Sequence, residues 1–155
     1  MTEPKDTPGV IAPPPIIFFG LWLLGLALNF FSPQPWLPDG LRWIVGVPLV
    51  GVGLLLGLWA FQTFRRAHTP TNPYESPTAI ATDGPYRFTR NPIYLGFALM
   101  YLGLTCLFNS LWPLPLLLLA LFIVDRGVIA REERYLEHKF GATYLKYKMT
   151  VRRWI

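Results

Sequence analysis

Four long apolar runs constrain this chain more than any other feature of its sequence. They cover residues 16–31, 41–64, 92–108 and 111–130. A helix needs about 20 mostly apolar residues to cross a bilayer, and shorter runs need flanking residues or a thinner membrane. Charged residues make up 15% of the chain, against about 25% in soluble domains. The sequence therefore predicts one all-α integral membrane domain over residues 1–155, with about four transmembrane helices.

The distribution of basic residues predicts the orientation of these spans. The connection 32–40 has no Lys or Arg, whereas the loop 65–91 has four arginines and the tail 131–155 has seven basic residues. Basic loops stay in the cytoplasm, so the loop, the tail and both termini are predicted to be cytoplasmic, at a prokaryotic inner membrane. The net charge of +5 lies beside apolar runs, which favours the lipid bilayer as partner and not nucleic acid.

The tail carries an amphipathic pattern. Leu136, Phe140, Tyr144 and Tyr147 follow one another at spacings of one helical turn, with an interruption at Gly141. Such spacing places the four side chains on one helical face. We expect a cytoplasmic amphipathic helix that either lies on the membrane or packs back on the loop.

Only residues 109–110 separate the last two apolar runs, which predicts a tight antiparallel hairpin. With equal rise per residue, Tyr94 comes level with Asp125, within about one turn. Two polar segments, GPYRFTRNPIY at 84–94 and DRGVIAREE at 125–133, are then brought together at the cytoplasmic interface.

Each polar cluster also has a purely structural interpretation. Asn91 and Pro92 are a favourable N-cap and first residue for a helix. Asp125 and Arg126 lie deep in the last run, where ionisable residues pair or face a cavity, and an ion pair with the facing hairpin arm would satisfy them. The carboxylates at 132–133 would suit a solvated helix face. The helix-start interpretation does not explain why Tyr86, Arg87, Arg90 and Tyr94 crowd around the start of the third run.

Carboxylates, arginines and tyrosine rings next to lipid suit a zwitterionic, aromatic cofactor. In S-adenosylmethionine a Glu can pair with the ammonium, an Arg with the carboxylate, and tyrosines with the adenine or sulfonium. Methyl transfer needs a dry, aligned approach and no metal. The isolated His68, His138 and Cys106 predict no metal site. These residue types alone do not separate this cofactor from a nucleotide.

The same segments resemble the isoprenylcysteine carboxyl methyltransferase and phospholipid methyltransferase superfamily. Its signature is Arg-His-Pro-x-Tyr, then a Glu-Glu pair, then Phe-Gly-x-x-Tyr-x-x-Tyr. This chain has RNPIY at 90–94, EE at 132–133 and FGATYLKY at 140–147. Asn91 stands at the motif histidine, and Val128 stands where the family has an arginine one turn before the first Glu.

The resemblance implies a short membrane methyltransferase that encloses S-adenosylmethionine at the cytosolic side. The expected acceptor is a lipophilic small molecule or lipid that enters from the bilayer. We expect catalytic roles for Glu133, Arg90 and Arg126. The implied cofactor contacts are Thr78, Ala79, Ile80, Ala81, Tyr86, Asn91, Pro92, Ile93, Tyr94 and Glu132.

Two other functions stay open at the level of sequence. Membrane sterol-type reductases look similar in their C-terminal half and bind NADPH, whose 2′-phosphate Arg65, Arg66 and Arg87 could contact. A non-catalytic membrane protein could instead bind anionic lipid through Arg152 and Arg153.

Overall fold

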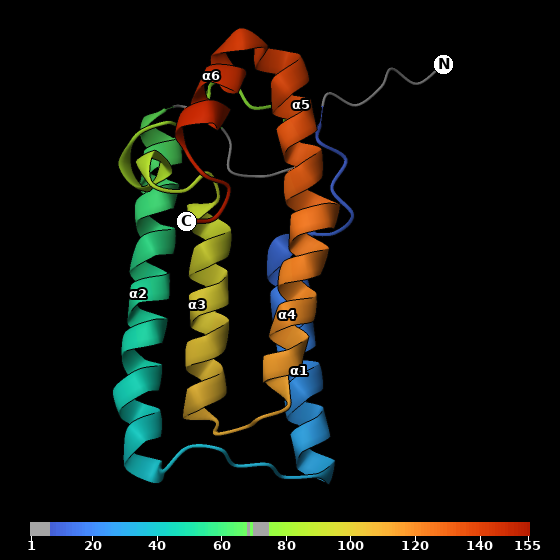
Figure 1. Ribbon diagram of the computed structural model, residues 1–155, viewed down its shortest axis with the longest axis vertical. Helices are drawn as coiled ribbons and strands as arrows, with labels where there is room; N and C mark the ends of the chain where they lie inside the picture. Colours follow the sequence, from blue (N-terminus) through green and yellow to red (C-terminus); the bar gives the residue numbers. More distant parts are fainter. Residues whose placement is uncertain (1–6, 68, 70–74) are drawn as a thin grey trace.

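The computed structural model describes residues 7–67, 69 and 75–155; His68 and part of the predicted loop lie outside this range. Four long helices run side by side, with the connecting loop and two shorter helices gathered at one end (Figure 1). The described residues contain no strand, so the all-α prediction is confirmed. The elements are α1 (Pro14–Phe31), α2 (Asp39–Arg66), η1 (Gly84–Arg87), α3 (Pro92–Leu107), α4 (Pro113–Val124), η2 (Asp125–Ile129), α5 (Ala130–Phe140) and α6 (Ala142–Thr150).

Each predicted apolar run overlaps one of the long helices. By length and composition, the helical stretches Pro14–Phe31, Asp39–Arg66 and Pro113–Phe140 can cross a membrane, and Pro92–Leu107 is a shorter apolar helix. The hairpin between α3 and α4 is looser than predicted, because neither helix includes residues 108–112. Its turn residue Asn109 has φ = 49°.

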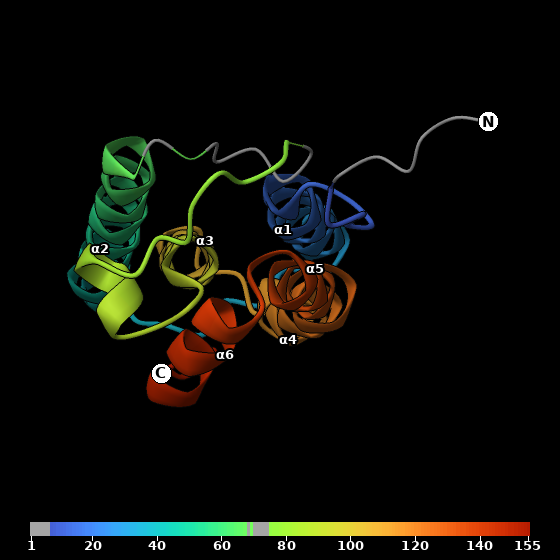
Figure 2. The same ribbon diagram turned by 90° about the horizontal axis from the view of Figure 1, so that it is seen from above.

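The four long helices associate as two pairs (Figure 2). In the α2–α3 pair, glycines let the two backbones touch. A Cβ atom on Gly53 would lie 2.6 Å from the carbonyl oxygen of Gly96, and one on Gly103 would lie 2.8 Å from that of Gly46. Small residues at such contacts allow close packing of membrane helices. The close contact fixes α3, whose first residues belong to the polar cluster, against α2.

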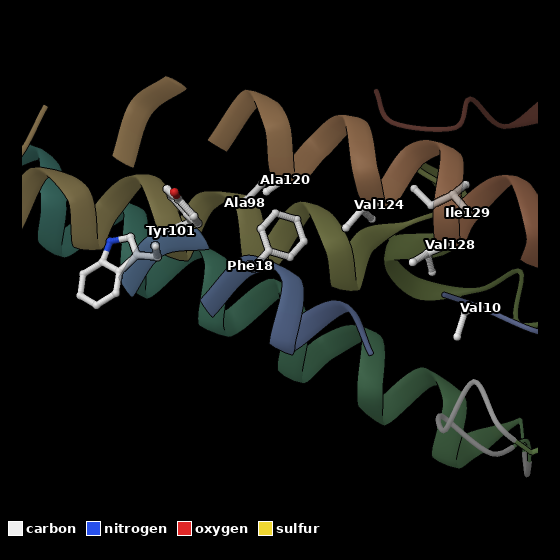
Figure 3. Packing of buried hydrophobic residues seen from close by; sticks show 9 residues of the cluster. Val10, Phe18, Ala98, Tyr101, Ala120, Val124, Val128 and Ile129 are labelled. Carbon is white, nitrogen blue, oxygen red and sulfur yellow. The ribbon is translucent and has the colours of Figure 1, made fainter. Parts of the chain in front are cut away.

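The second pair, α1 and α4, shares an apolar core with α3 and with η2 (Figure 3). Phe18 of α1 packs on Phe97 of α3, with ring centroids 5.9 Å apart. The Tyr101 hydroxyl of α3 donates to the carbonyl of Pro113, the first residue of α4, at 2.9 Å. The fully buried residues of this core include Ala120, Val124, Val128 and Ile129.

A π-helical turn, η2, interrupts the long helix between α4 and α5. Such a turn inserts one extra residue and re-aims the side chains that follow it, and π turns are frequent at functional sites. Gly127 within the turn packs under Ile11, and an added Cβ there would collide with the isoleucine side chain. Beyond the turn, Glu132 and Glu133 face the beginning of α3 and not the solvent.

The tail folds back over the loop, as one of the two sequence-based interpretations proposed. The helix breaks at Gly141, whose φ is 53°, so the predicted interruption is confirmed. The Tyr147 hydroxyl of α6 donates to the carbonyl of Tyr86 in η1 at 2.7 Å. The segment after α6 then returns to the start of α3, where Arg90 N–H donates to the carbonyl of Arg152 at 3.0 Å.

The Tyr94 side chain makes its contact about two helical turns beyond the residue that the hairpin register predicted. Tyr94 meets Glu132 and not the level of Asp125. One cause is that Cα–Cβ bonds tilt toward the N-terminus of a helix, so in antiparallel arms these two long side chains lean toward each other along the axis. The π turn is a second cause, because the register assumed a regular helix on both sides.

Candidate functional site

A cavity opens between the start of α3, the loop before it, and the helices α5 and α6. It encloses about 910 Å³ of space between protein atoms, part of which is open to the outside. The lining residues are Pro8, Phe64, Glu75, Pro77, Ala79, Ile80, Ala81, Tyr86, Arg90, Asn91, Ile93, Tyr94, Ile129, Glu132, Glu133, Leu136, Tyr144 and Tyr147.

Most of the residues selected from the sequence line this single cavity, and three do not. Thr78 neighbours the cavity wall, and its N–H donates to Thr69 Oγ1 at 3.1 Å. Pro92 is fully buried in the first turn of α3. Arg126 lies outside the group: its side chain is 73% exposed, and its guanidinium sits 5.8 Å from the ring of Phe122.

Glu132 supplies a carboxylate to the cavity. The Tyr94 hydroxyl donates to Glu132 Oε1 at 2.7 Å. The start of α3 and the first turn of α5 hold the two residues, so the bond crosses the space between the helix pairs. The tyrosine orients the carboxylate while the rest of its hydrogen-bonding capacity faces the cavity.

Glu133, in contrast, has three cationic side chains around its carboxylate. Arg90 Nη2 lies 3.0 Å from Glu133 Oε1, Arg153 Nη2 lies 2.6 Å from Oε2, and Lys148 Nζ lies 3.8 Å from Oε2. The Glu133 side chain is 6% exposed. A buried carboxylate with three cationic neighbours orients those neighbours. Its geometry therefore favours a role in positioning Arg90.

Arg90 carries the clearest sign of an absent partner. Its side chain is 9% exposed, and Nη2 is engaged by Glu133. Within the part of the chain that the structure describes, Nε and Nη1 are buried and have no hydrogen-bond partner. Buried donors without partners are costly and rare, so two such donors beside a cavity indicate a site for an anionic or strongly accepting group.

Arg90 and Glu132 thus present opposite charges to one cavity. Other charges nearby pair with one another: Arg153 joins Glu133 to Asp125, and Lys148 contacts Glu137. A ligand that binds both Arg90 and Glu132 needs an acceptor for the unpartnered Arg90 donors and a donor for the Glu132 carboxylate. The α-carboxylate and α-ammonium of an amino acid meet this requirement, and the site therefore fits the amino-acid end of S-adenosylmethionine.

The structural interpretation of the sequence proposed that Asp125 pairs with the facing hairpin arm. In the structure its partners come from the end of the chain instead. Arg153 Nη1 donates to its two oxygens at 3.2 and 3.1 Å, and Trp154 Nε1 donates to Oδ1 at 3.0 Å. The residues at 152–154 follow the last helix and carried no signal for this contact. The reason for the error is that the partner comes from a segment with no helical register to extrapolate.

Aromatic rings form much of the remaining wall, and several were missed by sequence reasoning. Phe64 packs edge-on against Tyr86, with centroids 5.2 Å apart. Tyr144 and Tyr147 were recognised as one helical face but not as cavity residues, and Phe64 gave no signal because it ends an apolar run. Burial raises the pKa of Tyr86 and of Tyr147 well above the usual value, so both phenols stay neutral hydrogen-bond donors.

The arrangement defines a helical membrane protein with an enclosed polar site at one end of its bundle. The sequence model of the phospholipid methyltransferase family matches residues 41–143, so this chain belongs to that family. The match includes the start of α3 and both glutamates, and it confirms the resemblance noted from the motifs. Membership supports enzymatic methylation as the class of reaction.

Two relatives share parts of the chain. An uncharacterised protein of Haemophilus influenzae is 45% identical over 64 residues, which cover 41% of this chain and 100% of that protein. The protein-S-isoprenylcysteine O-methyltransferase of Schizosaccharomyces pombe is 35% identical over 92 residues, which cover 59% of this chain. The chain matches only 38% of the length of the yeast enzyme. No solved structure matches the chain.

Proposed function

We propose that this protein is a membrane methyltransferase that uses S-adenosylmethionine to methylate a lipophilic small molecule or lipid. The observation that supports the cofactor most strongly is the pair of unpartnered Arg90 nitrogens opposite the Glu132 carboxylate in one cavity. S-adenosylmethionine, when bound, supplies an electrophilic methyl group. The protein would bind the cofactor, orient its methyl group toward the acceptor and exclude water from the site.

In this proposal one of the two unpartnered Arg90 nitrogens, Nε or Nη1, binds the cofactor carboxylate, and Glu132 binds its ammonium. Tyr94 keeps Glu132 in place through the 2.7 Å hydrogen bond. Charge-assisted bonds of this kind are stronger than neutral ones. Glu133, which the sequence suggested as catalytic, orients Arg90 from the opposite side. Arg126, also suggested as catalytic, has no cavity contact, so it receives no role.

The rings of Phe64, Tyr86 and Tyr144 line the cavity and suit the adenine, because aromatic side chains stack on flat heterocycles. Apolar residues of the loop, Ala79 to Ala81, close the wall. Exclusion of water strengthens electrostatic contacts and favours transfer to the acceptor over side reactions.

We infer a lipophilic acceptor from the position of the site in a protein with membrane-spanning helices. Three helices are long and apolar enough to cross a membrane, so an acceptor dissolved in the bilayer can approach the cavity from the side. The yeast relative is named for an isoprenylcysteine acceptor, and we extend to this chain only its lipophilic character. We place the cavity, the loop and both termini on the cytoplasmic side, by the distribution of basic residues.

Isothermal titration of the detergent-solubilised protein with S-adenosylhomocysteine tests this proposal, with NADPH as the competing ligand. Binding of the first and not of the second is expected. Arg65, Arg66 and Arg87 would have to hold the NADPH 2′-phosphate, but none lines the cavity, and Arg87 pairs with Asp83 at 2.9 Å. A sample with a cooperative thermal transition that binds no S-adenosylhomocysteine at millimolar concentration would refute the proposal.

A further inference from the structure

The short segment 151–155 contacts both sides of the cavity: the beginning of α3 on one side, and Asp125 and Glu133 on the other. Its backbone binds the beginning of α3: the Arg153 carbonyl accepts from Thr89 Oγ1 at 3.1 Å and from Asn91 Nδ2 at 2.9 Å. Arg90 N–H donates to the carbonyl of Arg152 at 3.0 Å. The side-chain amide of Asn91, the residue at the position of the motif histidine, thus donates a hydrogen bond to the backbone of this segment.

The Arg153 side chain binds the other side. Its Nε and Nη2 donate to the two Glu133 oxygens at 3.1 and 2.6 Å, and its Nη1 reaches Asp125 at 3.1 Å. One guanidinium therefore connects the π turn with the first turn of α5. Arg153 does not line the cavity, so any influence on a ligand must pass through Glu133.

The bidentate contact of Arg153 determines how Arg90 meets Glu133. Both Glu133 oxygens are taken by the Arg153 fork, and Arg90 approaches Oε1 with Nη2 alone. Arginine prefers bidentate pairing with a carboxylate where both oxygens are available. Without Arg153, the Arg90 guanidinium is free to turn and to spend a second nitrogen on Glu133. That nitrogen would no longer be available to a ligand.

We propose that Arg153 is a positioning residue for the cavity: it occupies Glu133, so that Arg90 keeps Nε and Nη1 unpaired and one of them can bind the anionic end of the ligand. This inference rests on the proposed function, since it assumes that the cavity binds the amino-acid end of S-adenosylmethionine. This role has a testable consequence. The affinity for the amino-acid part of the ligand must depend on Arg153, although Arg153 does not line the cavity.

The test compares Arg153→Met with Arg152→Met in the full chain. Arg152 has an exposed side chain that reaches the Ile155 carbonyl at 3.5 Å, and its backbone contact to Arg90 survives substitution. Calorimetry with two probes separates the ends of the ligand. S-adenosylhomocysteine carries the amino-acid part, and 5′-methylthioadenosine lacks it.

We expect Arg153→Met to bind S-adenosylhomocysteine about tenfold more weakly than the wild-type protein. Its affinity for 5′-methylthioadenosine, and the affinity of Arg152→Met for both probes, should stay within about twofold. Arg153→Lys, which retains the charge but not the fork, should fall between wild type and Arg153→Met, and it serves as the second variant if the methionine protein does not fold.

Three results would overturn the inference. Unchanged binding of S-adenosylhomocysteine by Arg153→Met, or by Arg153→Lys in its place, would show that Arg153 does not position Glu133 and Arg90 for the ligand. Equal weakening of both probes would show a general structural role. If the wild-type protein binds neither probe, the proposed function fails first and the inference fails with it, which is a separate and recognisable outcome.

Discussion

Removal of the Arg90 side chain gives the sharpest prediction about the cavity. Arg90 lines the cavity and pairs with Glu133 through one nitrogen, while two other nitrogens are buried without a partner. We expect Arg90→Met to lose affinity for S-adenosylhomocysteine but not for 5′-methylthioadenosine. The preference of the protein for the first ligand over the second is therefore the quantity to measure.

The magnitude follows from the contacts. A hydrogen bond to a charged group contributes about 1.5–3 kcal/mol, which corresponds to a loss of roughly 10- to 150-fold in affinity. The cost to folding should be modest for a buried arginine, because Glu133 keeps Arg153 at 2.6 Å and Lys148 at 3.8 Å. Breaking a buried pair is most destabilising when it leaves an uncompensated charge, and here it does not.

The assay is a pair of titrations on Arg90→Met, with Arg87→Met as the matched control. Arg87 is close in sequence, 69% exposed and paired with Asp83, so its removal should change neither affinity. Melting temperatures measured alongside identify any loss of fold. The reasoning is refuted if Arg90→Met, still folded, retains the wild-type preference for S-adenosylhomocysteine.

Three further predictions concern other contacts. Glu132→Gln should weaken S-adenosylhomocysteine binding by about tenfold in the same titrations; unchanged binding would contradict the ammonium contact. Gly53→Ala should lower the melting temperature, because its Cβ would meet a backbone oxygen at 2.6 Å, whereas Gly51→Ala, with open space, should not; equal effects would argue against the α2–α3 contact. Tyr147→Phe should cost about 1 kcal/mol and speed amide exchange around η1; unchanged exchange would mean that α6 does not hold the loop.

The sequence predicted the helices well because each depends on a local property. Apolar composition over 16–31 or 41–64 is sufficient to predict a helix of membrane length. The break at Gly141 was also predictable, because glycine alone adopts a positive φ without strain. Helix pairing was not predictable in this way, since the α2–α3 contact depends on which glycine faces Gly96.

The candidate site was predicted as a meeting of two segments but not in its details. The motif positions Tyr94 and Glu132 do come together, although by the reach of their side chains and not at the predicted level. The π turn at 125–129 changes the direction of everything after it, and no residue pattern announced it. Arg153 binds both Asp125 and Glu133, yet in sequence it is one basic residue of a basic tail.

The central claim is that the cavity between the start of α3 and α5 binds S-adenosylmethionine. An experimental structure of the protein with S-adenosylhomocysteine added tests it most directly. We predict ligand density in this cavity, with the carboxylate at Arg90 Nε or Nη1 and the ammonium at Glu132. Ligand density at another place, or an empty cavity in a sample saturated with bound ligand, would contradict it.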